Sequence, residues 1–551
     1  MSGQRAAWGA WPRVLRRLPL MVSGGVRRFA EDPWRGWAAA RRAVPGVARF
    51  TPDPRRPLAR VERAAAEDRL ADALDAFDDV REPSERVAAE RAISRLRGHY
   101  LEVATVRPRS RAERRQVEAA RRHCEVWSSP LPRWAGSPRS YPSSSSSSAG
   151  AGRPNVLHVV TNSLPRVQAG STIRTQRIAA AQGDVGWRVG VATRPGFPVF
   201  HGDLTSASER VYQGVRYHSL LPAWMPSAQK VPQVYARLLD DLVMRERYGL
   251  LHAASDHVNA RAALEVGHRR DIPVLYEART LPEESWLSRH GGEQARDSDA
   301  YRWMRARHQE VLLAADAVTT LGSAMRDAIL EMGVHPERIF VVPNAVPEGF
   351  CEPATPALLA RDRLGIDGGD LLLGTVTTMY SYEGLELLIA ATEELRRGGL
   401  DARLLLVGDG PERDRLLEQA ETAGVPVSAP GRVPVDQVTE YLDALDVFVL
   451  PRREDAITAL VTALKPLEAQ ARGIPVVGSD LPAVAEVLAA EAPRVAGRDP
   501  RVWAQALARY ADPGLRSAEG AAAREWVRAC RTWPTVMEGY ASAYAFVGSD
   551  V

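Results

Sequence analysis

Lys465 and Glu468 are the two residues of this sequence whose types and spacing most directly suggest chemistry. Of the 72 lysines and arginines in 551 residues, only Lys230 and Lys465 are lysines. Lys465 falls where the pattern predicts a helix start, near Ala463, and a cation there opposes the helix dipole by up to about 1 kcal/mol. A bound phosphate would offset that cost, and Glu468, on the same helix face, can accept two hydrogen bonds from a ribose diol. The pair therefore predicts a nucleoside diphosphate site; the alternative is an ion pair on a solvated helix face.

Turns of small residues mark other places where backbone N–H groups can bind an anion. Gly170 and Ser171 precede a helix that the pattern predicts from about Thr172. Gly408 and Gly431 follow two later apolar runs. Each of these turns has a simpler alternative explanation, which is tight turn geometry.

The elements that position these residues are strands and helices in alternation. Apolar runs of five to seven residues separated by helix-length segments indicate parallel strands buried on both faces. The predicted strands are NVLHVVT, WRVGVAT, GLLHAAS, IPVLYEA, DAVTTLG and RIFVVPN, then, after a break near 346–370, LLLGTVT, ARLLLVGDG, VSAPGR, DVFVLP and IPVVGS. The fold class is therefore α/β with two doubly wound units. Ligands of such sheets lie beyond the carboxyl ends of the strands, so we expect a ligand in a cleft between the units.

The remaining chain forms an N-terminal extension and a linker. Residues 57–125 show helical periodicity and predict a small helical hairpin or bundle. Residues 137–154 are rich in Ser, Pro and Gly and predict a flexible linker. The expected domains are the extension, 1–136; the linker, 137–154; a first Rossmann-like domain, 155–345; a second Rossmann-like domain, 346–532; and a final helix, 533–551.

The first fifty residues are basic and aromatic. They hold ten arginines, interleaved with five large aromatic side chains, and only two acidic residues. This composition suits the headgroups of an anionic membrane. The alternatives are a basic tail or a helix docked on the protein itself; a nucleic-acid partner is not expected because no recognition motif accompanies the charge.

Composition also limits the class of protein. No apolar run approaches the eighteen or so residues that span a bilayer. Cys124, Cys351 and Cys530 match no metal or redox spacing, so we expect no metal site and a reducing cytoplasmic location, with peripheral contact to the inner face of the membrane as an option.

The segment LPRREDAITALVTALKPLEAQARGIPVVGS resembles the donor-binding region of the retaining GT-B glycosyltransferases of family four. It is most similar to bacterial exopolysaccharide and exosortase-associated members. Further similar segments occur in the family's order over roughly residues 155 to 547: GSTIRTQRIAAAQ, VLYEARTLPEESW, ADAVTTLGSAMRDAI, MYSYEGLELLIAA, LLLVGDGPERDRL and GRVPVDQVTEYLDALDVFVLPRR. The final RTWPTVMEGYASAYAFV resembles the family's last helix, which commonly crosses back onto the first domain. The resemblance implies that 155–345 is the acceptor domain and 346–532 the nucleotide-sugar donor domain.

The resemblance implies transfer of a sugar from a nucleotide sugar, a UDP- or GDP-sugar, to a sugar or lipid-linked acceptor. The anomeric configuration would be retained, without metal or other cofactor. It places Lys465 on the diphosphate and Glu468 on the ribose, with His252 and Arg279 as further catalytic residues. The implied donor-binding residues also include Gly170, Ser171, Arg174, Thr378, Tyr380, Gly408, Gly431, Arg432 and Asp455. The implied acceptor-side residues are Glu277, Arg279 and Glu283; for Glu277 and Arg279, a buried structural ion pair is the alternative.

Three positions depart from the family pattern. Glu383 replaces a basic residue, Leu460 replaces a glutamate, and Ala254 replaces a histidine two places after His252. Glu454 or Asp455 is a candidate substitute for the missing glutamate, and His257 for the missing histidine. These departures leave a second function open, a GT-B binding or scaffold subunit without turnover. A nucleotide-sugar epimerase is a third, for which no acid and base carboxylates can be assigned.

Overall fold

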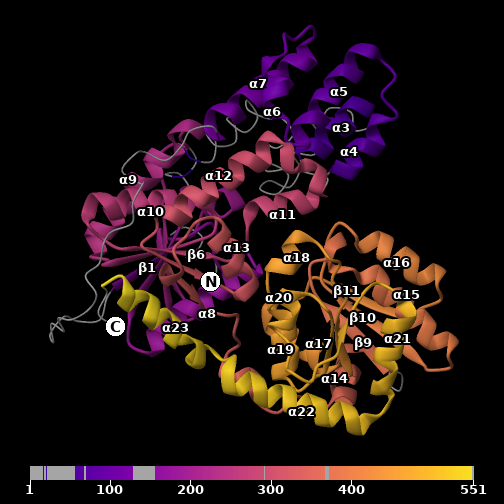
Figure 1. Cartoon of the computed structure of the whole chain (residues 1–551). Coiled ribbons are helices and arrows are strands. Elements are labelled where there is room, and N and C mark those ends of the chain that lie inside the picture. The colour runs from indigo at the N-terminus through magenta and orange to yellow at the C-terminus, as the bar shows by residue number, and fades with distance from the viewer. Residues whose placement is uncertain are drawn as a thin grey trace, which may run out of the picture. The chain divides into compact units, whose positions relative to one another are not determined.

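Two sheets form where the sequence places its apolar runs. The computed structural model describes residues 17, 20, 56–66, 70–127, 155–290, 292–366 and 371–548. The chain divides into a first unit, 1–318 with 543–551, and a second unit, 319–542 (Figure 1). The Arg- and Trp-rich segment, except for residues 17 and 20, and the predicted linker lie outside the described residues.

The first sheet has the strand order β3-β4-β2-β1-β5-β6-β7-β8 and the second β11-β10-β9-β12-β13-β14. All predicted apolar runs are strands. The bounds are β1 (Asn155–Val160), β2 (Arg188–Thr193), β3 (Glu209–Tyr212), β4 (Val215–Ser219), β5 (Leu250–Ala254), β6 (Val274–Ala278), β7 (Ala317–Thr320), β8 (Ile339–Val341), β9 (Leu371–Val376), β10 (Ala402–Val407), β11 (Val427–Gly431), β12 (Val447–Leu450), β13 (Val476–Ser479) and β14 (Arg494–Val495).

Helices connect these strands. Before the first sheet lie α3 (Pro57–Ala66), α4 (Leu70–Phe77), α5 (Pro83–Leu96), α6 (Tyr100–Thr105) and α7 (Arg111–Trp127). The first sheet is accompanied by α8 (Gly170–Asp184), α9 (Val231–Glu246), α10 (His257–Arg270), α11 (Pro282–Arg289), α12 (Asp299–Ala314) and α13 (Ser323–Glu331). The second has α14 (Ala357–Leu364), α15 (Leu385–Arg397), α16 (Arg413–Thr422), α17 (Val438–Asp443), α18 (Ala456–Leu460), α19 (Lys465–Ala471), α20 (Pro482–Ala485), α21 (Pro500–Ala508) and α22 (Pro513–Cys530). The last helix is α23 (Trp533–Phe546), whose residues from 543 onward belong to the first unit.

The pair β3 and β4 was not predicted. The two strands are antiparallel, and the turn residues Gln213 and Gly214 both have positive φ, 46° and 78°, as a two-residue hairpin turn requires. β3 lies at the sheet edge and its side chains are exposed or half-buried. A strand buried on neither face shows no apolar run, which explains why the sequence pattern missed it.

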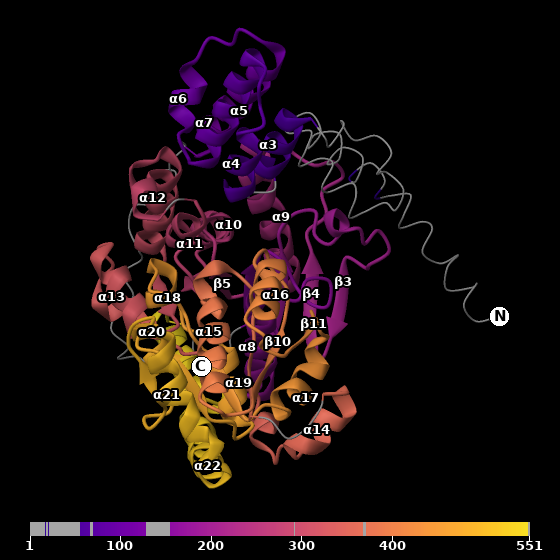
Figure 2. The same ribbon diagram turned by 90° about the vertical axis from the view of Figure 1, so that its right-hand side faces the viewer.

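The predicted helical extension is confirmed as the five helices α3 to α7. They lie together above α12 in both views (Figures 1 and 2). The backbone N–H of Leu101 donates to Asp299 Oδ2 at 2.8 Å, and the N–H of Ala300 donates to the Gly98 carbonyl at 3.1 Å. The rings of Tyr100 and Trp303 stack with their centroids 6.3 Å apart. These contacts make the extension part of the first unit.

The register of the first sheet brings polar side chains together. β1 pairs with β5 so that His158 lies opposite His252, and β5 pairs with β6 so that Ala254 lies opposite Glu277. Side chains two residues apart on a strand share a face. His158, His252 and Glu277 therefore lie on one face of the sheet, which Figure 1 shows covered by α8 and the end of α23.

The second sheet has an apolar core on each face because it is fully parallel. Leu371 and Leu373 pack on one side with Trp503 of α21. Leu372 packs on the other side with Ala469 of α19. The alternation follows from the two-residue period of a strand. α19 lies in the connection from β12 to the parallel strand β13, so its start follows the carboxyl end of β12.

Candidate functional site

Lys465 and Glu468 form an ion pair at the start of α19 in the second unit. The Lys465 Nζ atom lies 2.5 Å from Glu468 Oε2. The Lys465 side chain is 26% exposed, but that of Glu468 is only 1% exposed. The two side chains thus form the expected ion pair, but its carboxylate is buried and does not lie on a solvated helix face. Pro466, the next residue, has no N–H group to offer an anion. An anion at this helix start would therefore receive hydrogen bonds from the ammonium of Lys465, which has three hydrogens to donate.

Loops after β9, β10 and β11 meet beside one another in the second unit. The N–H of Gly408 donates to the Gly431 carbonyl at 2.9 Å. Gly408 has φ +134°, and a Cβ atom there would lie 1.8 Å from the Thr377 carbonyl oxygen. Gly431 has φ +83°. Turn geometry thus accounts for both glycines, and their loops form the edge of the sheet where ligands of parallel sheets bind.

The other predicted donor residues of this unit follow three of its strands: Thr378 and Tyr380 come after β9, Arg432 after β11 and Asp455 after β12. Thr378 is exposed, and the half-buried Tyr380 stacks on Tyr382 with ring centroids 5.3 Å apart. Arg432 is exposed directly after β11. Asp455 accepts a hydrogen bond from the N–H of Ile457 at 3.1 Å and so caps α18. The cap gives Asp455 a structural task in addition to any contact with a ligand.

The acid at position 383 is neutralised by an arginine from another loop. Glu383 is buried, and its carboxylate accepts hydrogen bonds from Arg452, which follows β12, at 3.0 and 3.2 Å. Arg453 Nη2 lies 2.7 Å from Glu386 Oε1, and Arg498 also pairs with that carboxylate. Three guanidinium groups thus surround two carboxylates. The departure at position 383 therefore adds no net negative charge to this part of the unit.

The other two departures from the family pattern are at Leu460 and Ala254. Leu460 is half-buried at the end of α18, and Glu454 is exposed in the loop before it. Ala254 is buried. His257 begins α10, its ring 5.0 Å from that of Trp127, so the candidate substitute for a missing histidine lies against the helical extension.

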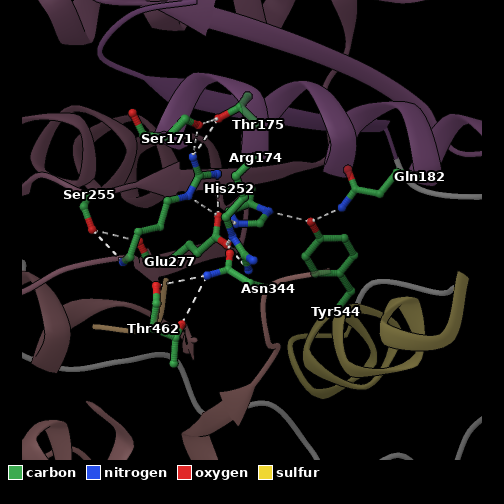
Figure 3. A network of polar contacts seen from close by, with 11 residues as sticks. Ser171, Arg174, Thr175, Gln182, His252, Ser255, Glu277, Asn344, Thr462 and Tyr544 are labelled. Atoms are coloured by element: carbon green, nitrogen blue, oxygen red, sulfur yellow. Dashed lines mark hydrogen bonds and ion pairs between the residues drawn. The ribbon is translucent and has the colours of Figure 1, made fainter. Parts of the chain in front are cut away.

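Asn344 is a polar residue that the sequence analysis did not select. It follows β8, and its Nδ2 donates to both the carbonyl and the hydroxyl oxygen of Thr462 at 3.2 Å (Figure 3). Thr462 lies three residues before Lys465. The sequence contained one indication of this residue: an asparagine directly after the apolar run RIFVVP. A buried amide there needs polar partners.

In the first unit, α8 begins at Gly170, two residues earlier than predicted. Gly170 and Ser171 are exposed, whereas Thr172 is buried and its hydroxyl accepts a hydrogen bond from the Ala169 N–H at 3.0 Å. The turn therefore presents its first two residues outward. Arg174, one turn further, points into the unit.

Glu277 lies at the centre of a buried polar network (Figure 3). Its Oε1 accepts from Arg174 Nε at 2.9 Å, and its Oε2 accepts from Arg279 Nη2 at 2.6 Å. His252 Nε2 lies 3.2 Å from the same Oε2. Burial alone would raise the pKa of Glu277, but Arg279 and Arg174 outweigh it and hold the pKa well below its usual range. For Glu277 and Arg279, a buried structural ion pair was the alternative to ligand contact, and this ion pair is present.

Arg279 also reaches the first turn of α8. Its Nη1 donates to the Ser171 carbonyl at 2.8 Å and to the Thr175 hydroxyl at 2.7 Å. Glu283, predicted beside it, is separate: its carboxylate lies 3.0 Å from His308 Nδ1. The network thus joins four of the predicted residues, Ser171, Arg174, His252 and Arg279, around Glu277.

Four histidines of the first unit predict its response to acid. Burial is the main cause that lowers the pKa of His158, His218, His252 and His257, the last to about 4. A histidine whose folded pKa is depressed favours the unfolded state once the pH falls below its ordinary value near 6.5. We expect the free energy of unfolding of this unit to fall as the pH goes from 7 to 5, a range in which the depressed carboxylates stay ionised.

Chemical denaturation at pH 7 and 5 measures this effect. His257→Gln should reduce the difference between the two pH values, whereas His335→Gln, at a 65% exposed side chain, should leave it unchanged. Equal stability at both pH values would contradict the expectation.

Two kinds of feature were not found among the described residues. Within the described ranges, no helix has both the length and the apolar character needed to cross a bilayer. In the same ranges, no three His, Cys, Asp or Glu side chains are grouped as metal ligands.

Comparison with protein families finds two matches. Residues 168–349 match the model described as Glycosyltransferase Family 4, and residues 370–512 match Glycosyl transferases group 1. A D-inositol 3-phosphate glycosyltransferase of Segniliparus rotundus is 30% identical over 26% of this chain and 32% of that protein. The 2-deoxystreptamine N-acetyl-D-glucosaminyltransferase of Streptomyces fradiae is 30% identical over 32% of this chain and 42% of that protein. The putative colanic acid biosynthesis glycosyltransferase WcaL of Escherichia coli is 29% identical over 31% and 41%. The chain spans less than half the length of these three relatives.

Solved structures show the same fold. Sucrose-phosphate synthase of Thermosynechococcus elongatus matches with a TM-score of 0.58 and 19% identity, over 71% of this chain and 98% of that one. HepE of Anabaena in complex with UDP-glucose matches with a TM-score of 0.55 and 16% identity, over 71% and 99%. These likenesses confirm the predicted fold class, GT-B with an N-terminal helical extension.

Proposed function

Because residues 168–349 and 370–512 match its two domains, the chain belongs to the glycosyltransferases of family 4 and group 1, and we propose that it transfers a sugar from a nucleotide sugar to an acceptor hydroxyl. The observation that carries the proposal is the pair of Lys465 and Glu468. A half-buried ammonium beside a buried carboxylate, at the carboxyl end of a parallel sheet, suits a diphosphate next to a ribose.

The proposed chemistry depends on charge that develops on the leaving diphosphate. An ammonium held in place stabilises that charge without reorganisation, and we assign this role to Lys465. Glu468 accepts from the ribose hydroxyls and fixes the donor relative to Lys465. The acceptor hydroxyl enters on the face from which the diphosphate departs, and a phosphate oxygen takes its proton. This course retains the anomeric configuration and uses neither a metal nor a side-chain nucleophile.

The substrate classes are part of the proposal. WcaL is named for colanic acid biosynthesis, and HepE was solved with UDP-glucose. These names support a role in cell-surface polysaccharide synthesis and a uridine donor; a guanosine donor and glycolipid synthesis are the other options within the proposal. A lipid-linked acceptor would agree with the ten arginines of residues 1–50, at the cytoplasmic face of a membrane.

A thermal-shift panel tests the donor site. The wild-type chain and Lys465→Ala are heated with UDP, GDP, ADP, TDP and their sugars. A nucleotide at about a hundred times its dissociation constant adds roughly 2.7 kcal/mol to the folded state. We expect one nucleotide to raise the melting temperature of the wild type and to lose this effect in Lys465→Ala, because the variant lacks the phosphate-binding cation.

The other lysine of the chain provides the control. Lys230 is exposed in the first unit, and Lys230→Ala should respond to nucleotides as the wild type does. If no nucleotide stabilises the wild type, the donor site is degenerate and the scaffold function takes its place. If Lys465→Ala keeps the full shift, the phosphate contact is wrongly assigned.

A further inference from the structure

Tyr544, in the last turn of α23, lies inside the first unit in a chain of hydrogen bonds. Its hydroxyl lies 2.7 Å from His252 Nδ1 and 2.9 Å from Gln182 Nε2 (Figure 3). The side chain is fully buried, and its ring lies 4.9 Å from the ring of Trp187. Gln182 Oε1 in turn lies 2.7 Å from His158 Nε2. None of these contacts is used by the proposed donor site.

The direction of each hydrogen bond in this chain follows from the charge of Glu277. The Glu277 carboxylate is ionised and only accepts, so the ring nitrogen of His252 that faces it, Nε2, carries a proton. Burial is the main cause that lowers the pKa of His252. In the neutral ring, a proton on Nε2 leaves Nδ1 as an acceptor. The Tyr544 hydroxyl must therefore donate to Nδ1, and its oxygen accepts from the Gln182 amide.

The groups that face His252 come from four elements. His158 comes from β1, Arg174 and Gln182 from α8, Glu277 from β6 with Arg279 directly after it, and Tyr544 from α23. Among these groups, the Tyr544 hydroxyl is the donor that Nδ1 needs. A proton on Nδ1 instead would turn a bare Nε2 lone pair toward a carboxylate, which is repulsive in a low-dielectric interior.

We propose that Tyr544 is a positioning residue whose hydroxyl holds His252 in the neutral tautomer with the proton on Nε2. In that form His252 supports Glu277, Glu277 orients Arg279, and Arg279 holds the carbonyl of Ser171 in the first turn of α8. The tautomer of His252 and the order of the first turn of α8 do not depend on the proposed function. That the turn serves a ligand rests on the proposed function.

The matched experiment compares two tyrosine hydroxyls that contact histidines. Tyr544→Phe removes the donor to His252. Tyr248→Phe removes an equally buried hydroxyl, 3.0 Å from His218 Nε2 in the same unit. Nitrogen NMR of the full chain labelled with 15N-histidine reports the protonation of each ring nitrogen, and His252→Gln identifies the His252 signals. Hydrogen exchange of the peptide 168–182 reports the order of the first turn of α8.

In the wild type at pH 7 we expect Nε2 of His252 protonated and Nδ1 bare. Tyr544→Phe should shift the Nδ1 signal of His252, because that nitrogen loses its hydrogen-bond donor or takes a second proton, and should speed exchange in 168–182 several-fold. Tyr248→Phe should change neither.

A wild-type spectrum with Nδ1 of His252 protonated overturns the proposal, and this result does not depend on how Tyr544→Phe folds. Unchanged His252 signals in Tyr544→Phe also overturn it, as does equal exchange in both variants, which would indicate lost packing alone. No readout here uses a donor. The expected change at Nδ1 in Tyr544→Phe, together with a nucleotide panel that stabilises nothing, would support the positioning role and refute the proposed function.

Discussion

Glutamine in place of Glu277 is expected to lower the free energy of unfolding of the first unit by about 3–5 kcal/mol, the usual cost of removing one partner from a buried ion pair. Arg174 and Arg279 are both buried and both donate to this carboxylate. A neutral amide leaves two guanidinium charges in the interior without a counter-charge. Native-state hydrogen exchange of β5 and β6 measures the effect within this unit, which matters because a chain of two units need not unfold in one step.

A surface glutamate of the same unit is the control for this substitution. Glu265 pairs with Arg269 at 2.9 Å one helical turn away, and its side chain is 25% exposed. Exposed pairs of this kind contribute about 0–1 kcal/mol, so Glu265→Gln should have little effect. Equal losses in the two variants would mean that the Glu277 network does not stabilise the fold more than a surface pair does.

Alanine in place of Glu468 is expected to weaken nucleotide binding by about ten- to a hundredfold, because a hydrogen bond to a charged group contributes about 1.5–3 kcal/mol. The carboxylate is 1% exposed and holds Lys465 Nζ at 2.5 Å. Its removal takes away the proposed ribose acceptor and releases the ammonium of Lys465, the proposed phosphate ligand, from its position. Calorimetric titration with the nucleotide that stabilises the wild type measures the loss, and the sugar-transfer rate should fall with it.

The control for Glu468 is a glutamate in an ion pair of the same spacing. Glu525 pairs with Arg528 three residues later at 2.6 Å, and its side chain is 68% exposed. Glu525→Ala should leave nucleotide affinity unchanged. If Glu468→Ala also retains full affinity and turnover, Glu468 has no part in the donor site.

The arginines after β12 change how the departure at position 383 is interpreted. From the sequence, an acid in place of a cation suggested a weakened phosphate site. In the structure Arg452 is bound to Glu383, with a further hydrogen bond from its Nη1 to the Val461 carbonyl at 3.1 Å. The sequence could not reveal this pairing, because residues 383 and 452 lie on different loops and only the order of β9 beside β12 brings them together.

The local pattern of the sequence determined the elements of this protein. Every predicted apolar run became a strand, although β8 and β11 are only partly buried. Helix periods predicted α3 to α7 and the helix of Lys465, because burial along one helix stripe leaves a periodic pattern in the sequence. The local sequence also determined the pair of Lys465 and Glu468, since residues three apart on a helix are neighbours whatever the tertiary structure.

Only the tertiary structure decided which distant side chains meet. His252, Glu277 and Tyr544 are separated by up to 292 residues, and nothing local distinguishes Tyr544 from the other tyrosines of the chain. Likewise, the sequence is equally consistent with Glu277 and Arg279 as ligand contacts or as an internal ion pair. In the structure Arg174 contacts the other carboxylate oxygen of Glu277. The physical reason is that polar partners of a buried group are chosen by sheet order and register, and these depend on long-range packing that no short stretch of sequence contains.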